Sequence, residues 1–116
     1  MSTDRELLEM AAKAAGFYSR DAWAFDPDWG LKISSGAPPY EWWNPSSDEG
    51  DAARLAMRLC AAGKMRIQIT EQSITCFYEQ DGVFVPWSWG YETCTLSEAF
   101  CKCITGAAAE IGRNMP

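Results

Sequence analysis

The sequence contains no histidine. Without histidine the chain cannot form a Ser–His or Cys–His catalytic pair, and it lacks the commonest neutral-pH base and metal ligand. Carboxylate-only mechanisms remain possible, and the one tight acidic cluster is Asp48, Glu49 and Asp51. We therefore expect a protein that is not an enzyme and that holds no metal or other cofactor.

Long apolar runs are absent as well. No stretch approaches the roughly 18 residues that a membrane-spanning helix needs. Residues 1–9 are polar and acidic, whereas a secretory signal is basic and then apolar. The five cysteines are an odd number. Together these features predict reduced thiols, a cytoplasmic protein and no membrane partner.

An excess of basic residues is also missing, because 10 Lys and Arg stand against 16 Asp and Glu and give a net charge of −6. A protein that binds a phosphate backbone needs a basic face, so we expect no direct contact with nucleic acid. The acidic residues are spread along the chain rather than gathered in a tail. The charge therefore does not predict a nucleic-acid mimic either.

The chain does contain enough apolar sequence for one core. Its 116 residues are 47% hydrophobic and 22% charged, which is typical of a single globular domain over residues 1–116. Three segments have helical periodicity between boundary signals, namely Asp4–Ala15, 48–62 and 96–111. Their expected N-caps are Thr3, Ser47 and Thr95.

Alternating apolar and polar residues between these helices predict strands. A hairpin is expected within residues 17–34, and a three-stranded meander in segments 65–70, 74–78 and 83–89. Residues 36–44 are expected to form a loop. Pro86 cannot donate to a ladder, so the last strand should lie at an edge. The predicted fold is α+β, a small single domain with an antiparallel sheet packed by about three helices in the order α-ββ-α-βββ-α.

Three segments carry a family resemblance: residues 6–16, Trp43-Asn44-Pro45 with residues 48–59, and residues 107–113. In these segments the chain resembles the phage ABA sandwich domain family, a group of small phage and prophage proteins. The resemblance implies a small α+β domain with helices packed on a sheet, and a phage or prophage gene. It implies no activity, because that family has none assigned. The departures from it are a Pro38-Pro39 loop and a cysteine-rich end.

Two clusters invite a chemical interpretation. The acidic cluster at residues 48–51 would stabilise a helix N-terminus, and the alternative is a metal or acid–base role. The thiols of Cys94, Cys101 and Cys103 could bind zinc with Cys60 or Cys76, but the paired two-residue spacing of zinc sites is missing. Simple packing of the cysteines is the favoured interpretation.

The tryptophans are the best candidates for binding, because Trp is enriched at interface hot spots. Trp87 and Trp89 should share one face of their strand, where they either fill the core or contact a partner. Trp43 is expected in the core. The residues predicted to contact a partner, with two flanking acids, are Tyr40, Glu41, Trp42, Trp87, Trp89 and Glu92.

These features favour a non-enzymatic phage or prophage accessory protein that binds a host protein or protein complex in the host cytoplasm. The concrete version is an inhibitor of a host defence complex, of the anti-CRISPR kind. One alternative is a small-ligand-binding protein or enzyme that uses a Trp-lined face and the helix start at Asp48 to Asp51. Another is a self-associating domain, a homo-oligomer without a separate partner.

Overall fold

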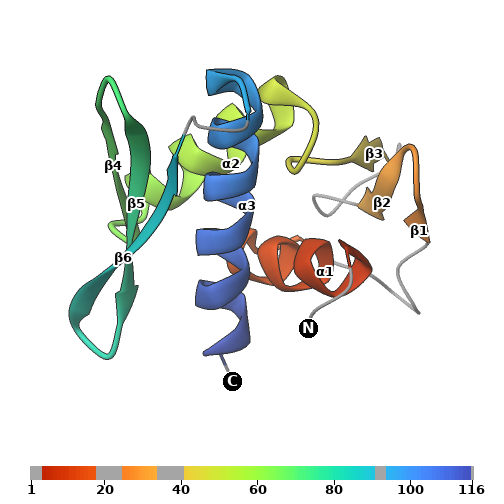
Figure 1. Cartoon of the computed structure of the whole chain (residues 1–116). Helices are drawn as coiled ribbons and strands as arrows, with labels where there is room; N and C mark the ends of the chain where they lie inside the picture. The colour runs from red at the N-terminus through yellow and green to blue at the C-terminus, as the bar shows by residue number, and fades with distance from the viewer. Residues whose placement is uncertain (1–3, 18–24, 34–40, 91–93, 116) are drawn as a thin grey trace.

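The structure is a computed structural model that describes residues 4–17, 25–33, 41–90 and 94–115. Within these residues it contains three helices and two antiparallel three-stranded sheets (Figure 1). The predicted class, a small α+β domain with three helices, is therefore confirmed. The strands form two separate sheets rather than the one predicted, and the first hairpin acquires a third strand.

The helices are α1 (Asp4–Ala15), α2 (Glu49–Ala61) and α3 (Leu96–Arg113). The Thr95 hydroxyl caps α3 as predicted, accepting a hydrogen bond from the Glu98 N–H. The prediction that Ser47 caps α2 is wrong by one residue. Asp48 has the extended cap conformation, and its side chain accepts a hydrogen bond from the Asp51 N–H. The expected cap of α1 lies outside the described residues.

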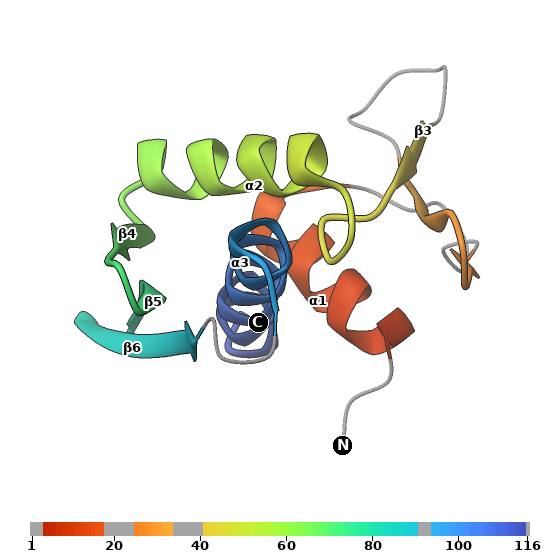
Figure 2. The same cartoon turned by 45° about the horizontal axis from the view of Figure 1, so that its top comes forward.

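Helix α3 is the centre of the molecule. Figure 1 shows it upright between one sheet and the other elements, and Figure 2, which looks along it, shows α1 and α2 against two further sides. Residues 99–112 of this helix are buried or half-buried except at Lys102, so its buried surface is wider than one apolar stripe. Cys101 and Cys103, which point in different directions, are accordingly both buried.

Small residues let α1 approach α3 closely. The facing surfaces contain fully buried alanines, among them Ala11, Ala12 and Ala108. Gly112 packs so tightly on the carbonyl of Met10 that a Cβ there would overlap the backbone of α1. The small-residue segment 107–113 is therefore explained by helix packing.

The larger sheet contains β4 (Met65–Ile69), β5 (Ser73–Gln80) and β6 (Val83–Gly90), in that order. The β5–β6 turn has positive φ at Asp81 (53°) and Gly82 (81°), as the Asp-Gly signal predicts. The face that carries the buried Ile74, Cys76 and Tyr78 packs against α3. In Figures 1 and 2 this sheet covers one side of the central helix.

The smaller sheet contains β1 (Phe25–Asp26), β2 (Gly30–Ile33) and β3 (Glu41–Trp43). The prediction of a loop through residues 36–44 is wrong at β3. That short strand forms because Leu31 pairs with Trp43 and both side chains are buried. The Trp43 ring meets Phe17 edge to face at 5.3 Å, so the core position predicted for Trp43 is confirmed.

Candidate functional site

The acidic helix start serves the fold. The Asp48 carboxylate caps α2, and Asp51 accepts a 2.9 Å hydrogen bond from the Asn44 N–H and pairs with Arg54 at 2.6 Å. The carbonyl of Asn44 in turn accepts the Asp48 N–H at 2.8 Å. The Trp43-Asn44-Pro45 segment and the α2 start thus hold each other in place. Of the three acids, Glu49 alone lines a pocket described below.

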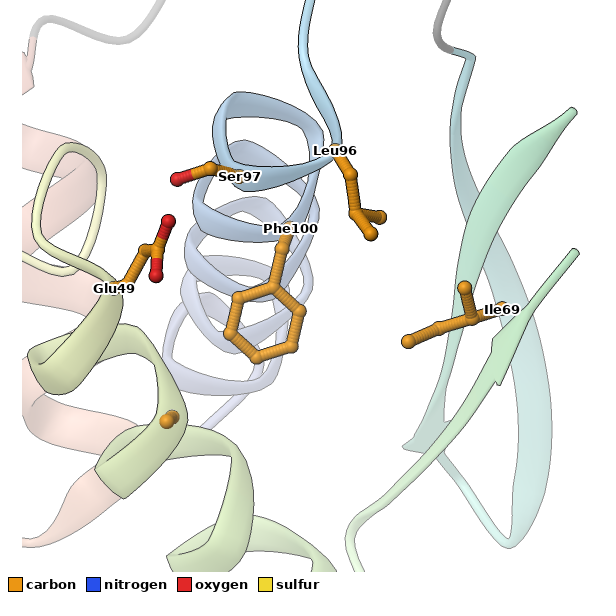
Figure 3. Close-up of a pocket in the computed structure, with 6 residues that line it drawn as sticks. Glu49, Ile69, Leu96, Ser97 and Phe100 are labelled. Carbon is orange, nitrogen blue, oxygen red and sulfur yellow. The ribbon is translucent and has the colours of Figure 1, made fainter. Parts of the chain in front are cut away.

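A groove of about 300 Å³ opens where the starts of α2 and α3 meet the end of β4 (Figure 3). We call it the α2–α3 groove, and its lining residues are Glu49, Ala53, Ile69, Leu96, Ser97 and Phe100. In Figure 3 the side chains of Ile69, Leu96 and Phe100 face the same open space from the sheet and from α3. Most of its wall is therefore apolar.

The groove opens beside the outer strand β4, which is less covered at its end than β5, where Ile74, the partner of Ile69, is 0% exposed. Along the inner face of β4, burial falls from Met65, which is 2% exposed, to Ile69, which is 55% exposed. Leu96, in the first turn of α3, is 52% exposed. Large apolar side chains that gather on a surface in this way mark a site of interaction.

The polar side of the groove comes from two residues. Figure 3 shows the Glu49 side chain pointing toward Ser97, on the side of Phe100 away from Ile69. The Glu49 carboxylate and the Ser97 hydroxyl thus lie beside the apolar wall. Such a pairing suits a partner that presents an apolar side chain next to a donor or a cation.

A second, smaller pocket of about 110 Å³ lies on the other side of α3, where α1 and β6 approach the helix. We call it the indole pocket, because Trp87 and Trp89 line it together with Lys102 and Thr105. The predicted pair on β6 is therefore brought together at one site. Trp87 is half-buried, whereas Trp89 is 38% exposed.

The other predicted contact residues lie elsewhere. Trp42 is on β3 and is 42% exposed, as expected for a contact residue. Glu41 is on the same strand, while Tyr40 and Glu92 lie outside the described residues. In both views the sheets of β3 and β6 flank opposite sides of α3. The structure therefore does not join Trp42 to the tryptophans of β6 in one surface.

Strand β6 is an edge of its sheet among the described strands, as Pro86 predicts. In a two-residue hairpin, Gln80 and Val83 form a hydrogen-bonded pair, and such pairs recur at every second residue. Pro86 faces Phe77 at an intervening position, where an N–H would point away from β5. The proline thus removes an outward donor from the middle of the edge, which disfavours pairing with another strand.

The five cysteines are free thiols. The Sγ atoms of Cys76 and Cys103 lie 3.2 Å apart between β5 and α3, and the Cys103 Sγ lies 3.1 Å from the Trp87 carbonyl oxygen, to which its one S–H can donate. The hydrogen bond to Cys103, followed by burial, raises the pKa of the Cys76 thiol, and the same hydrogen bond lowers the pKa of Cys103. This pair fills the core between sheet and helix.

The sequence carried only weak signals for the α2–α3 groove. Phe100 has the spacing of a core residue and is half-buried, and Leu96 falls inside the capping signal of α3. Ile69 alternates correctly for the inner face of its strand. The exposure of Ile69 and Leu96 depends on how the helices pack on the sheet, which no local pattern shows.

No family model, curated protein or solved structure matches the chain. Within the residues that the structure describes, no group of three or more Cys, Asp or Glu side chains is placed to hold a metal ion. In the same residues no helix has the length and apolar character to cross a membrane.

Proposed function

We propose that the protein acts by binding another protein through the α2–α3 groove, without catalysing a reaction. The observation that carries this proposal is the pair Ile69 and Leu96, each more than half exposed on the rim of an apolar groove of about 300 Å³. Exposing two large aliphatic side chains to water is unfavourable, and a partner's apolar side chain would cover them.

The partner's chemistry follows from the groove and the overall charge. The apolar wall suits an aliphatic or aromatic anchor, and Glu49 beside it favours a Lys or Arg next to that anchor. The net charge of −6 would speed association with a basic partner at low salt. A basic surface is what a nucleic-acid-handling machine presents to its substrate.

The biological version of the proposal is a phage or prophage accessory protein that inhibits a host defence complex in the host cytoplasm, in the anti-CRISPR manner. It rests on the resemblance of residues 6–16, 43–45 with 48–59, and 107–113 to the phage ABA sandwich domain family, and on the acidic, tryptophan-rich composition. The surface around Trp42 is a second candidate contact, because that indole is 42% exposed.

The two rival functions make different demands. An enzyme at the α2 start would need free carboxylates, whereas Asp48 and Asp51 are engaged in the cap and in the Arg54 pair. Self-association would bury the same groove against a second copy of the chain. It is separated from binding to another protein by the mass of the purified protein in solution.

Affinity capture from host lysate tests the proposal when wild type is compared with an Ile69→Ser/Leu96→Ser variant. We expect wild type to retain a discrete protein or complex that the variant loses. A Val83→Ser variant is the matched control, because Val83 is 63% exposed and lies outside the groove. If all three proteins retained the partner equally, the α2–α3 groove would not be its binding site.

A further inference from the structure

We propose that the free edge of β4 takes up an extended segment of the partner protein as an added strand. This inference rests on the proposed function, because it specifies the form of the segment that enters the α2–α3 groove. Strand β4 is an outer strand of its sheet among the described strands, and its last residue, Ile69, also lines the groove. The edge and the groove therefore belong to one surface.

Two hydrogen bonds at the ends of β4 fix the direction of its backbone groups. The Glu79 N–H donates to the Lys64 carbonyl at 3.0 Å, and the Thr70 N–H donates to the Ser73 carbonyl at 2.8 Å. Hydrogen-bonded pairs in an antiparallel ladder recur at every second residue. The even-numbered residues from 64 to 70 thus bond to β5, and the odd-numbered residues between them direct their N–H and C=O groups away from it.

The outward backbone groups of Ile67 and Ile69 have no backbone partner among the described residues. No described strand lies beside β4 on that side, and none of the backbone hydrogen bonds outside the helices and sheets involves either residue. Ile67 is half-buried, and Ile69 is more than half exposed. A strand edge with unpaired N–H and C=O groups is a template for pairing with another chain.

The two edges of the larger sheet differ in what they offer. On β6 the outward position in the middle of the edge is Pro86, which has no N–H. On β4 the outward positions are Met65, Ile67 and Ile69, and all three keep their N–H. Met65 is buried at the start of β4, where the strand follows α2, and Figure 1 shows β4 running away from the end of that helix. The accessible part of the edge is therefore its second half, at residues 67–69.

Occupation of the groove determines which backbone form the partner needs. A partner that covers Ile69 also removes water from the outward N–H and C=O groups of that residue. Backbone groups that lose water without gaining a hydrogen bond are costly. A helix has its own backbone groups already paired, whereas an extended segment presents free N–H and C=O groups. The partner segment is therefore extended where it passes Ile69.

The side chain opposite Ile69 would enter the groove. Figure 3 shows the Ile69 side chain pointing from β4 toward Phe100. We infer antiparallel pairing, which is slightly more stable per residue, and directly opposite residues then share one face of the sheet. An apolar residue opposite Ile69 would thus face Phe100, and its two neighbours would point to the other face, beside the exposed Gln68. The segment is expected to alternate between apolar and polar residues.

The test measures hydrogen exchange of the backbone N–H groups by NMR, using the full chain labelled with nitrogen-15. The probe is the synthetic peptide acetyl-Lys-Thr-Val-Thr-Val-Thr-Lys-amide, whose valines would lie opposite Ile67 and Ile69. The control is the same peptide with N-methyl groups on both valines, which removes the donors that would face β4. We expect the parent peptide alone to slow exchange at Ile67 and Ile69 in a saturable way.

Two variants separate the backbone contact from the side-chain contact. Ile69→Ala and Ile69→Pro both remove the apolar side chain, but only the second also removes the outward N–H. Proline should be tolerated there because Pro86 occupies an equivalent outward position on β6. Ile69→Pro should bind the peptide about three- to ten-fold more weakly than Ile69→Ala, as expected for one lost hydrogen bond. If Ile69→Pro does not fold, an ester in place of the Gln68–Ile69 amide removes the same N–H.

Three results would overturn the proposal: no saturable protection of Ile67 and Ile69, equal binding of the N-methylated peptide, or equal affinity of the variants with and without the Ile69 N–H. Protection that is present in the free protein and grows with its concentration would also overturn it, because a second copy of the chain would then hold the edge.

The proposed function is tested separately, by the capture of a partner with Ile69→Ser/Leu96→Ser. If that variant loses the captured partner while the edge of β4 gains no protection from the peptide, the groove remains a binding site and only the added strand is wrong. If the edge pairs with the peptide but the captured partner is indifferent to the variant, the proposed function is wrong instead.

Discussion

The indole ring of Trp87 lies directly on Gly106, so that a Cβ added to the glycine would fall 2.5 Å from the ring nitrogen. This contact fixes the distance between β6 and the central helix. It also explains why a glycine occurs in the middle of α3, where it weakens helix formation by about 1 kcal/mol relative to alanine.

Gly106→Ala is predicted to destabilise the protein despite the gain in helix propensity. The new methyl group would push the indole off the helix, and such overpacking typically costs about 1–3 kcal/mol. Gly50→Ala is the control, because Gly50 is also helical and its nearest atoms, at 3.1 Å or more, are side-chain ends. Urea unfolding should show a loss for the first variant and at most a small change for the second. A gain in stability for Gly106→Ala would mean that Trp87 does not rest there.

Truncation of the core should be costly on both helices that meet at the centre. Leu55 on α2 is 1% exposed and Ile104 on α3 is 0% exposed. Replacing either with alanine should lower the free energy of unfolding by about 2–5 kcal/mol. Met57→Ala, on the exposed face of α2, should change it by less than about 0.5 kcal/mol. Equal losses at Leu55 and Met57 would show that α2 is rotated.

The elements themselves were largely predictable, because their signals are local. Helix α1 has its predicted bounds, and the Asp81-Gly82 turn and the Thr95 cap are where the sequence places them. Strand β3 was not predictable, since it exists through its pairing with β2. A Cβ at Gly30 would meet the Trp43 carbonyl and lie 2.6 Å from the Asn44 Cβ, so this glycine allows the close approach of the two strands. That requirement can be recognised only once the fold is known.

The candidate site was predicted only in part, because it also depends on contacts between elements that are distant in the sequence. Alternation along β6 placed Trp87 and Trp89 on one face, and the structure agrees. It could not show that Ile69 stays exposed beside α3, nor that Trp42 lies on the opposite side of α3. Those facts depend on how whole elements pack, which the spacing of residues within one segment does not report.

The free energy of unfolding should fall in alkaline solution, and part of this fall should come from the Cys101 thiol. Burial, and then the negative charges of Glu49 and Asp48, raise the pKa of the Cys101 thiol above its ordinary 9.0. In the unfolded chain the Cys101 thiol ionises near pH 9.0, whereas in the folded protein it stays protonated to higher pH. The contribution of this thiol to the free energy of unfolding is therefore complete below that pH and is lost as the pH rises. The slope for one such group is at most about 1.4 kcal/mol per pH unit.

The measurement for Cys101 is urea unfolding between about pH 8 and about pH 10. The stability of wild type should decline more steeply than that of Cys101→Ala, so the difference between them narrows as pH rises. Parallel curves would show that the folded thiol ionises like the unfolded one.

Thermal unfolding should be indifferent to a chelator and to a reductant. The cysteines are free thiols, and the closest pair, Cys76 and Cys103, is separated by 3.2 Å between sulfur atoms, a hydrogen-bond distance. We expect the same melting temperature with and without EDTA or dithiothreitol, and no zinc in the native mass spectrum. A drop of many degrees with EDTA would reveal a metal that the fold needs.

Binding of a partner protein in the α2–α3 groove is tested by the affinity of the captured partner for three variants of equal thermal stability. For Ile69→Ser/Leu96→Ser we predict binding at least about ten-fold weaker than wild type, as expected when hot-spot side chains are removed. Val83→Ser and Trp42→Ala should bind within about two-fold of wild type. If the groove variant binds as wild type does while Trp42→Ala loses the partner, the contact surface is the β3 side of the molecule and the account of the groove is wrong.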